Sequence, residues 1–192
     1  DLVATAFYAY SASIVLETAR ILGYTADVAE LEHWYAAILH AFEQEFLTPN
    51  VRLAAHTQTA YVLALAFDLL PTEQARERAV DALVQKVGQG NEAQLTTGFL
   101  GTPYLCHVLS RYGHTDLAYQ LLLKREYPSW LYPVTKGATT IWEHWDGIRP
   151  DGSFWSDDMN SFNHYAYGAI ADWLFEVVGG IQPDTEHPAF RR

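Results

Sequence analysis

The run Trp142-Glu143-His144-Trp145-Asp146 holds the residues best suited to chemistry in this sequence. Aromatic rings cover the apolar faces of sugars, and carboxylates bind sugar hydroxyls or move protons during glycosidic cleavage. A glutamate between two large rings is partly removed from water, which favours general acid or base work. The run therefore suggests a sugar site. A loop whose tryptophans pack over helix ends and whose acids face water has the same composition and stays an alternative.

Other reactive residues lack the partners that a catalytic or metal site needs. His33 and His40 lie seven residues apart on one helix face, but no His-Glu-x-x-His pattern or third ligand accompanies them. Cys106 and Ser153 have no base partner at a diagnostic spacing. The glycine-rich residues 97–102 lack the Gly-Lys-Ser/Thr ending of a phosphate loop. We therefore expect no metal ion, no organic cofactor and no nucleotide.

The elements that must position these residues are helical. Apolar residues at helical spacing, with capping residues and Gly or Pro stops, predict seven helices, and no strand has a comparable pattern. The predicted helices cover about residues 2–22, 25–48, 57–70, 72–88, 97–112, a short helix from Thr115, and 161–178. In the first helix the predicted buried stripe is Val3, Phe7, Tyr10, Ile14 and Ile21. The fold class is thus all-α, a single domain of stacked helical hairpins over residues 1–192.

One connection is far longer than the others. About 35 residues between Arg125 and Asn160 lack a sustained helical period and hold four of the six tryptophans and several acids. Long ordered loops in compact domains are usually functional. His164 is expected in the first turn of the helix that follows, where it can face whatever the loop encloses. The residues of interest in the loop are Trp130, Trp142, Trp145, Trp155, Glu143, Asp146, Asp151, Asp157 and Asp158.

Composition and charge exclude several classes of function. Twelve Lys and Arg against 23 Asp and Glu leave a formal net charge of −11, which argues against nucleic-acid binding. The most apolar run, residues 61–70, is far shorter than the roughly 20 residues that cross a bilayer, so we expect no membrane association. The amphipathic pattern begins at Leu2 without a targeting signal, which suggests numbering inside a longer protein. The compartment, cytoplasmic or secreted, stays open.

Four motifs occur in one order along the chain. They are Thr-Gly-Phe-Leu-Gly-Thr-Pro-Tyr-Leu at 97–105, Pro-Ser-Trp at 128–130, Gly-Ala-Thr-Thr-Ile-Trp-Glu at 137–143, and Asn-Ser-Phe-Asn-His-Tyr-Ala-Tyr-Gly-Ala at 160–169. In these motifs the chain resembles the bacterial α-L-rhamnosidases of glycoside hydrolase family 78. The similarity is clearest from about residue 96 to residue 181. Two positions depart from the family pattern, since Leu131 stands where Gly is frequent and His144 where Arg is common.

The resemblance implies a partial (α/α)6 toroid and an inverting glycoside hydrolase without a cofactor. Glu143 matches the family's general base, and His164 matches a histidine that contacts the rhamnose ring. Trp142, Trp145 and Asn163, beside these two residues, are predicted to bind the sugar. The family's general acid lies upstream of anything that matches here. We therefore expect a C-terminal part of the catalytic domain that is inactive or severely impaired on its own.

The implied substrate is a terminal α-L-rhamnosyl group in a glycoside or oligosaccharide. Part of a toroid leaves inner helices without partners, so self-association is also expected. Two other functions stay open. The toroid hosts many sugar specificities, so another inverting (α/α)6 glycosidase is the first alternative. The second is a non-catalytic carbohydrate-binding or scaffold module, in which the aromatic rings form a binding platform.

Overall fold

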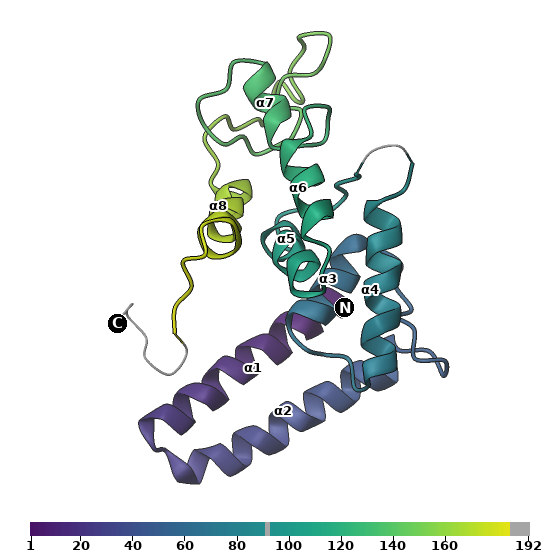
Figure 1. Ribbon diagram of the computed structural model, residues 1–192. Coiled ribbons are helices and arrows are strands. Elements are labelled where there is room, and N and C mark those ends of the chain that lie inside the picture. The colour runs from purple at the N-terminus through teal and green to yellow at the C-terminus, as the bar shows by residue number, and fades with distance from the viewer. Residues whose placement is uncertain (91–92, 185–192) are drawn as a thin grey trace. The chain divides into compact units, whose positions relative to one another are not determined.

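The computed structural model describes residues 1–90 and 93–184, which form helices and two isolated β-bridges but no strand (Figure 1). The predicted all-α fold class is confirmed. The chain forms two compact units, Asp1–Lys86 and Val87–Arg192. The single domain over residues 1–192 stays a prediction, because two compact units can belong to one domain or to two. The α-helices are α1 (Leu2–Leu22), α2 (Thr25–Phe46), α3 (Gln58–Ala66), α4 (Glu73–Val87), α5 (Thr102–Arg111), α6 (Thr115–Leu123), α7 (Leu131–Thr135) and α8 (Ile170–Trp173).

The first unit begins with a long antiparallel hairpin of α1 and α2 (Figure 1). Gly23 ends α1 in the left-handed conformation, with φ 75°, which a residue without a Cβ adopts at little cost. The predicted buried stripe of α1 is wrong in its second half, since Ile14 and Ile21 are 48% and 76% exposed, whereas Val3 and Phe7 are half-buried. The buried residues of α1 are Leu2, Leu16 and three alanines. Alanines allow two helix backbones to approach closely, and the larger side chains then lie outside the contact.

The helix α3 is buried along almost its whole length. The Thr57 hydroxyl caps this helix by accepting a hydrogen bond from the Ala60 backbone N–H at 3.1 Å. The Thr72 hydroxyl likewise accepts from the Ala75 N–H at 3.1 Å, at the start of α4. Thr25 and Thr115, where caps are also expected, are instead the first residues of α2 and α6 and make no side-chain cap bond. The helix α3 ends earlier than predicted, because Asp68 adopts a positive φ of 53° and leaves the helical conformation.

The helix α1 is also long and apolar enough to cross a membrane by length and composition, a test that core helices of soluble proteins and signal sequences pass as well. No uninterrupted apolar run marks this segment in the sequence, because polar residues such as Ser11, Ser13 and Glu17 interrupt it. Several apolar side chains of the hairpin are exposed, among them Val15, Ile21 and Trp34. Self-association through such surfaces stays a prediction.

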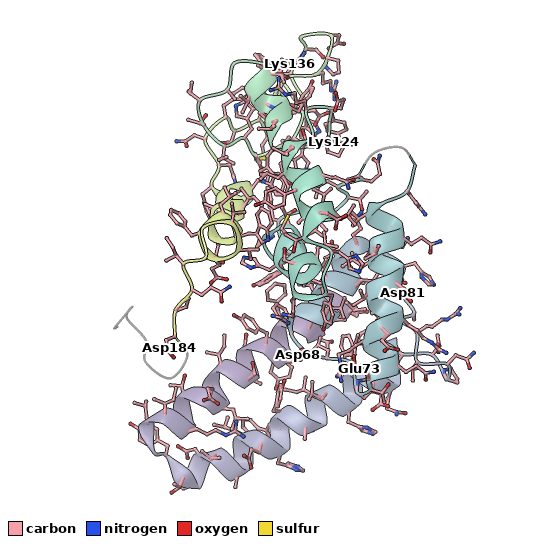
Figure 2. The ribbon with its side chains drawn as sticks, in the orientation of Figure 1. Asp68, Glu73, Asp81, Lys124, Lys136 and Asp184 are labelled. Carbon is pink, nitrogen blue, oxygen red and sulfur yellow. The ribbon has the colours of Figure 1, made fainter. Side chains whose placement is uncertain are left out.

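The second unit is built around α5, which packs on α6 and α8. Trp173 of α8 is fully buried, and its Nε1–H donates to the Ser110 hydroxyl of α5 at 2.9 Å. The 3-10 helix η1 (Ala166–Ala169) precedes α8, and the π-helix η2 (Leu174–Val178) follows it. Lys124, labelled in Figure 2 at the end of α6, donates to the Ala93 carbonyl at 3.1 Å.

Two predicted helix boundaries are wrong in the second unit. The helix α5 begins at Thr102 rather than near residue 97, because residues 98–101 form a turn in which the Gly101 N–H donates to the Gly98 carbonyl at 3.2 Å. The last helical segment begins at residue 166 rather than at 161, so His164 precedes it. Residues 160–165 are not helical, since several of their backbone groups bond to residues of the long loop. The sequence pattern also missed α7, a five-residue helix inside that loop.

Candidate active site

The segments 140–143 and 161–164 are hydrogen-bonded to each other through their backbones. The Glu143 N–H donates to the Ser161 carbonyl at 2.9 Å, and the His164 N–H donates to the Ile141 carbonyl at 2.8 Å. The Thr140 hydroxyl donates to a backbone carbonyl of the same opposing segment. The predicted general base and the predicted rhamnose-binding histidine therefore lie on directly neighbouring segments.

The Glu143 side chain is half-buried. Within residues 1–90 and 93–184 its carboxylate takes part in no ion pair or hydrogen bond. A general base needs an oxygen that is free to accept a proton from water. The backbone of Glu143 is thus held while its carboxylate stays available to a water molecule or a ligand.

The indole of Trp142 is buried beside this segment. Its side chain is only 5% exposed, and it packs edge-on against the Phe162 ring with centroids 4.9 Å apart. Gly147 lies against both rings, and the Asn160 amide donates to the Gly147 carbonyl at 2.8 Å. Trp142 offers little surface to a ligand in this arrangement, and its predicted role in sugar binding stays a prediction.

Gly147 is the tightest point of this packing. A Cβ there would lie 3.0 Å from an atom of Trp142, 3.1 Å from one of Phe162 and 3.4 Å from the Asn160 Oδ1. We expect Gly147→Ala to lower the free energy of unfolding by about 1–3 kcal/mol through overpacking. Gly98→Ala is the matched control, because a Cβ at Gly98 meets nothing within 4 Å and no positive φ is required there. Urea denaturation of the two variants tests this, and equal stabilities would contradict the packing argument.

Trp145 lies between two other aromatic residues, one stacked on its ring and one edge-on to it. Its ring lies 3.7 Å from that of Tyr167, at an interplanar angle of 18°, and the Trp130 ring meets it edge-on at 5.4 Å. The Trp130 Nε1–H also donates to the Tyr167 carbonyl at 2.9 Å. This stack joins the Trp-Glu segment to η1. Trp145 keeps part of its surface exposed, and its role in binding sugar stays a prediction.

The buried phenol of Tyr167 is expected to make the stability of the second unit fall at alkaline pH. Burial, with a smaller contribution from Tyr127, raises the pKa of Tyr167 to about 12. A tyrosine in the unfolded chain has a pKa of about 10, so above that pH the unfolded chain loses a proton that the folded chain keeps. Stability is therefore expected to fall by roughly 2 kcal/mol between about pH 10 and pH 12 through this group.

Tyr167→Phe is expected to reduce that alkaline loss of stability, because phenylalanine has no proton to release. The measurement is urea denaturation at about pH 8 and about pH 11. Near pH 8 the phenol is neutral in both the folded and the unfolded chain, whereas near pH 11 it is mostly ionised in the unfolded chain and mostly neutral in the folded one. Tyr8→Phe, at a phenol that is 60% exposed in the first unit, is the control. An alkaline loss that is the same in both variants would contradict the assignment to Tyr167.

The rest of the long loop is well connected. The Trp155 backbone N–H donates to the Gly147 carbonyl at 3.1 Å, and Asp151 accepts hydrogen bonds from the backbone N–H and the hydroxyl of Ser153. These bonds hold the pKa of Asp151 below its usual value. The Tyr132 hydroxyl donates to the Ile148 carbonyl at 2.9 Å, which joins the loop to α7. Residues 147–155 thus form a closed, internally bonded turn.

His144 and Lys136 of the long loop, and Asn163 just after it, lie near the predicted site in the sequence. His144, which departs from the family pattern, stacks on the Trp155 ring at 3.6 Å. Lys136, labelled in Figure 2 beside α7, donates to the Pro150 carbonyl at 3.4 Å. Asn163 is exposed, and its side chain has no hydrogen-bond partner in the described part of the chain. Its predicted contact with sugar stays a prediction.

His164 borders an open pocket of about 810 Å³. Its ring lies parallel to the Phe99 ring, with centroids 4.8 Å apart. No sequence signal links Phe99 to His164, because the two residues are 65 positions apart and only the fold brings them together. The pocket residues are Phe99, Leu100, Pro103, Ile141, His164, Tyr165, Ala166, Gly168 and Ala169.

A second cluster, which the sequence analysis missed, joins α5 to α8 and η2. One ligand atom each from His107, Asp172 and Glu176 lies within 4.8 Å of the others, so this group could hold a metal ion. His107 directs Nε2 toward Asp172 at 3.2 Å and Nδ1 toward Glu176 at 3.5 Å. A metal ion binds only one imidazole nitrogen, so the arrangement fits an imidazole between two carboxylates better. No spacing signature in the sequence links these positions.

Cys106 and Ser153, the two other residues that could act as nucleophiles, lie in unsuitable surroundings. Cys106 is buried, and burial raises the pKa of its thiol to about 12, so little reactive thiolate forms at neutral pH. The Ser153 hydroxyl donates to Asp151 at 2.7 Å. Glu143 and His164 therefore remain the predicted functional residues of the second unit.

Comparison with known proteins identifies the family. The model of the bacterial alpha-L-rhamnosidase six-hairpin glycosidase domain matches residues 1–178. An alpha-L-rhamnosidase of Streptomyces avermitilis is 44% identical over 95% of this chain and 17% of its own length. One from Formosa agariphila is 45% identical over 95% of this chain and 20% of its own. The chain spans about a fifth of the length of these relatives.

Solved structures agree with this result. The alpha-L-rhamnosidase of Streptomyces avermitilis complexed with L-rhamnose superposes with a TM-score of 0.89 at 44% identity, over 95% of this chain and 17% of that one. The native enzyme of Aspergillus terreus superposes with a TM-score of 0.92 at 38% identity, over 97% of this chain and 21% of that one. The resemblance inferred from four motifs is confirmed: the chain belongs to the bacterial alpha-L-rhamnosidase six-hairpin glycosidase domain family.

Proposed function

We propose that this chain contributes the general-base side of the active site of an inverting α-L-rhamnosidase. The observation that carries the proposal is the half-buried, unpaired carboxylate of Glu143 on a segment bonded to that of His164. The family contains named alpha-L-rhamnosidases, and one related structure is described as complexed with L-rhamnose. The proposed substrate is a terminal α-L-rhamnosyl group of a glycoside or oligosaccharide.

In the proposed reaction, Glu143 accepts a proton from a water molecule as that water attacks the anomeric carbon. The bond from this carbon to the glycosidic oxygen breaks, and a carboxylic acid on the opposite side protonates the departing oxygen. The two carboxyl groups of an inverting enzyme stand about 6.5–9.5 Å apart, which leaves room for the water. We propose that the general acid belongs to a part of the intact protein outside this chain.

His164 is proposed to bind a hydroxyl of the rhamnosyl ring. Its position on the segment bonded to the Trp-Glu segment supports a role close to Glu143. The aromatic residues around the pocket support binding of a sugar face, since such rings cover apolar C–H surfaces. Neither metal nor organic cofactor has a role in this proposal.

The test is to follow hydrolysis by the full-length protein that contains this chain, here called the intact protein. A natural α-L-rhamnosyl disaccharide and a panel of aryl glycosides are the substrates, and proton NMR identifies the anomer released first. We expect rhamnosides to be cleaved with β-L-rhamnose released first, because inversion converts the α-linkage into the β-anomer. Release of α-L-rhamnose first would contradict the inverting mechanism.

The same panel distinguishes the alternatives. Cleavage of other glycosides without cleavage of rhamnosides would favour another (α/α)6 glycosidase. Binding of rhamnose without any hydrolysis would favour a carbohydrate-binding module. The 192-residue chain alone is expected to fail on the disaccharide, whose poor leaving group needs a general acid. Efficient cleavage of the disaccharide by the chain alone would show that the acid lies within it.

A further inference from the structure

His164 is held by three separate contacts. Its ring stacks on the Phe99 ring, with centroids 4.8 Å apart and planes inclined by only 13°. Its Nδ1 faces the Ala166 backbone N–H at 3.3 Å. Its own backbone N–H donates to the Ile141 carbonyl. Both the plane and the rotation of the imidazole are therefore determined by neighbours.

The contact with Ala166 also determines where the imidazole carries its proton. A backbone N–H can only donate, so Nδ1 must present a lone pair to it. A neutral imidazole has one N–H, which must then be on Nε2. In residues 1–90 and 93–184 no group hydrogen-bonds to Nε2 of His164. The ring therefore keeps a free donor while it borders the open pocket.

Phe99 is itself held in place. Its ring meets that of Tyr167 at 5.0 Å with an angle of 58°, and Tyr167 stacks on Trp145 at 3.7 Å. A continuous set of ring contacts thus runs from His164 through Phe99 and Tyr167 to the residue two positions after Glu143. The orientation of the imidazole is in this way coupled to the segment that carries the proposed base.

We propose that Phe99 is a positioning residue that, together with the Ala166 amide, holds His164 as a neutral Nε2–H donor toward a hydroxyl of the substrate. The proposal rests on the proposed function for the identity of that substrate. Phe99 acts through His164, by restricting the rotation of its ring. A sugar hydroxyl then meets a donor that is already oriented, which lowers the entropy lost on binding.

The first test is direct and needs no substrate. Long-range 1H–15N NMR of the 192-residue chain at about pH 8.5, where histidines are mostly neutral, reports the tautomer of each imidazole. His164→Asn identifies the signals of His164. We expect the Nε2–H tautomer almost alone. A Nδ1–H tautomer, or a mixture of the two, would overturn the proposal.

The second test measures the role of Phe99 in the intact protein. Phe99→Leu keeps an apolar side chain but removes the flat ring, and we expect KM for an aryl α-L-rhamnoside to rise about 3- to 10-fold with kcat nearly unchanged. Phe99→Tyr keeps the ring and is expected to have the KM of the unchanged protein. Phe175→Leu is the matched control, because Phe175 is 64% exposed and lies outside the pocket.

The two tests separate failure of this inference from failure of the proposed function. If the intact protein cleaves rhamnosides but Phe99→Leu leaves KM unchanged, Phe99 does not position His164. An equal loss of kcat in Phe99→Leu and Phe99→Tyr would also overturn the positioning role. If the intact protein cleaves no rhamnoside, the proposed function fails, and the tautomer measured by NMR still decides how His164 is held.

Discussion

The intact protein carrying Glu143→Gln is expected to lose about 100- to 10,000-fold in kcat on an α-L-rhamnosyl disaccharide, with KM nearly unchanged. Glutamine has the size of glutamate but cannot accept a proton from the attacking water. The contacts that hold the segment are made by its backbone, through the N–H bond to Ser161, and the substitution leaves them in place. The proposed contact between His164 and the sugar also remains.

Glu126→Gln is the matched control for this variant. Glu126 lies in the same long loop, is exposed, and makes no ion pair or hydrogen bond in the described part of the chain. We expect its kcat and KM to equal those of the unchanged protein. Normal turnover by Glu143→Gln, with folding confirmed by circular dichroism, would remove Glu143 from the reaction. Equal losses in both variants would point to a general effect of the loop charge.

The substitution Trp173→Ala is expected to lower the free energy of unfolding of the second unit by about 3–5 kcal/mol. Trp173 is fully buried, and its ring meets that of Tyr119 edge-on at 5.2 Å. Alanine would leave a large cavity between α8 and α5 and would remove the hydrogen bond to Ser110. This is the largest expected effect on stability, because Trp173 is the largest fully buried side chain among residues 1–90 and 93–184.

Urea denaturation of the chain, followed by near-ultraviolet circular dichroism, measures this loss. Trp34→Ala is the matched control, since Trp34 of α2 is 53% exposed. Exposed substitutions away from special features change stability by about 0.5 kcal/mol or less. A loss below about 1 kcal/mol for Trp173→Ala, far less than a large-to-small core change costs, would show that α8 does not pack as described.

Some helix boundaries were predictable from a local signal. The α1 helix extends over the predicted residues 2–22, and the Thr72 hydroxyl caps the helix expected to follow it. Each of these features depends on a few adjacent residues and their backbone bonds. Other local boundaries were wrong, because the turn at residues 98–101 and the positive φ of Asp68 leave no clear pattern in the sequence. Where a boundary depends on distant partners, the prediction was wrong, as for residues 160–165, which bond to residues of the long loop.

The sequence by itself determined the all-α class, the family and the importance of Glu143 and His164 as candidates, because these follow from helical periodicity and from motifs of adjacent residues. Only the tertiary structure decided which face of α1 is buried, that Phe99 lies under His164, and that His107 meets two carboxylates. The physical reason is that packing pairs residues far apart in the chain. Which surfaces meet depends on side-chain volume and on backbone groups that need partners, and neither leaves a local pattern.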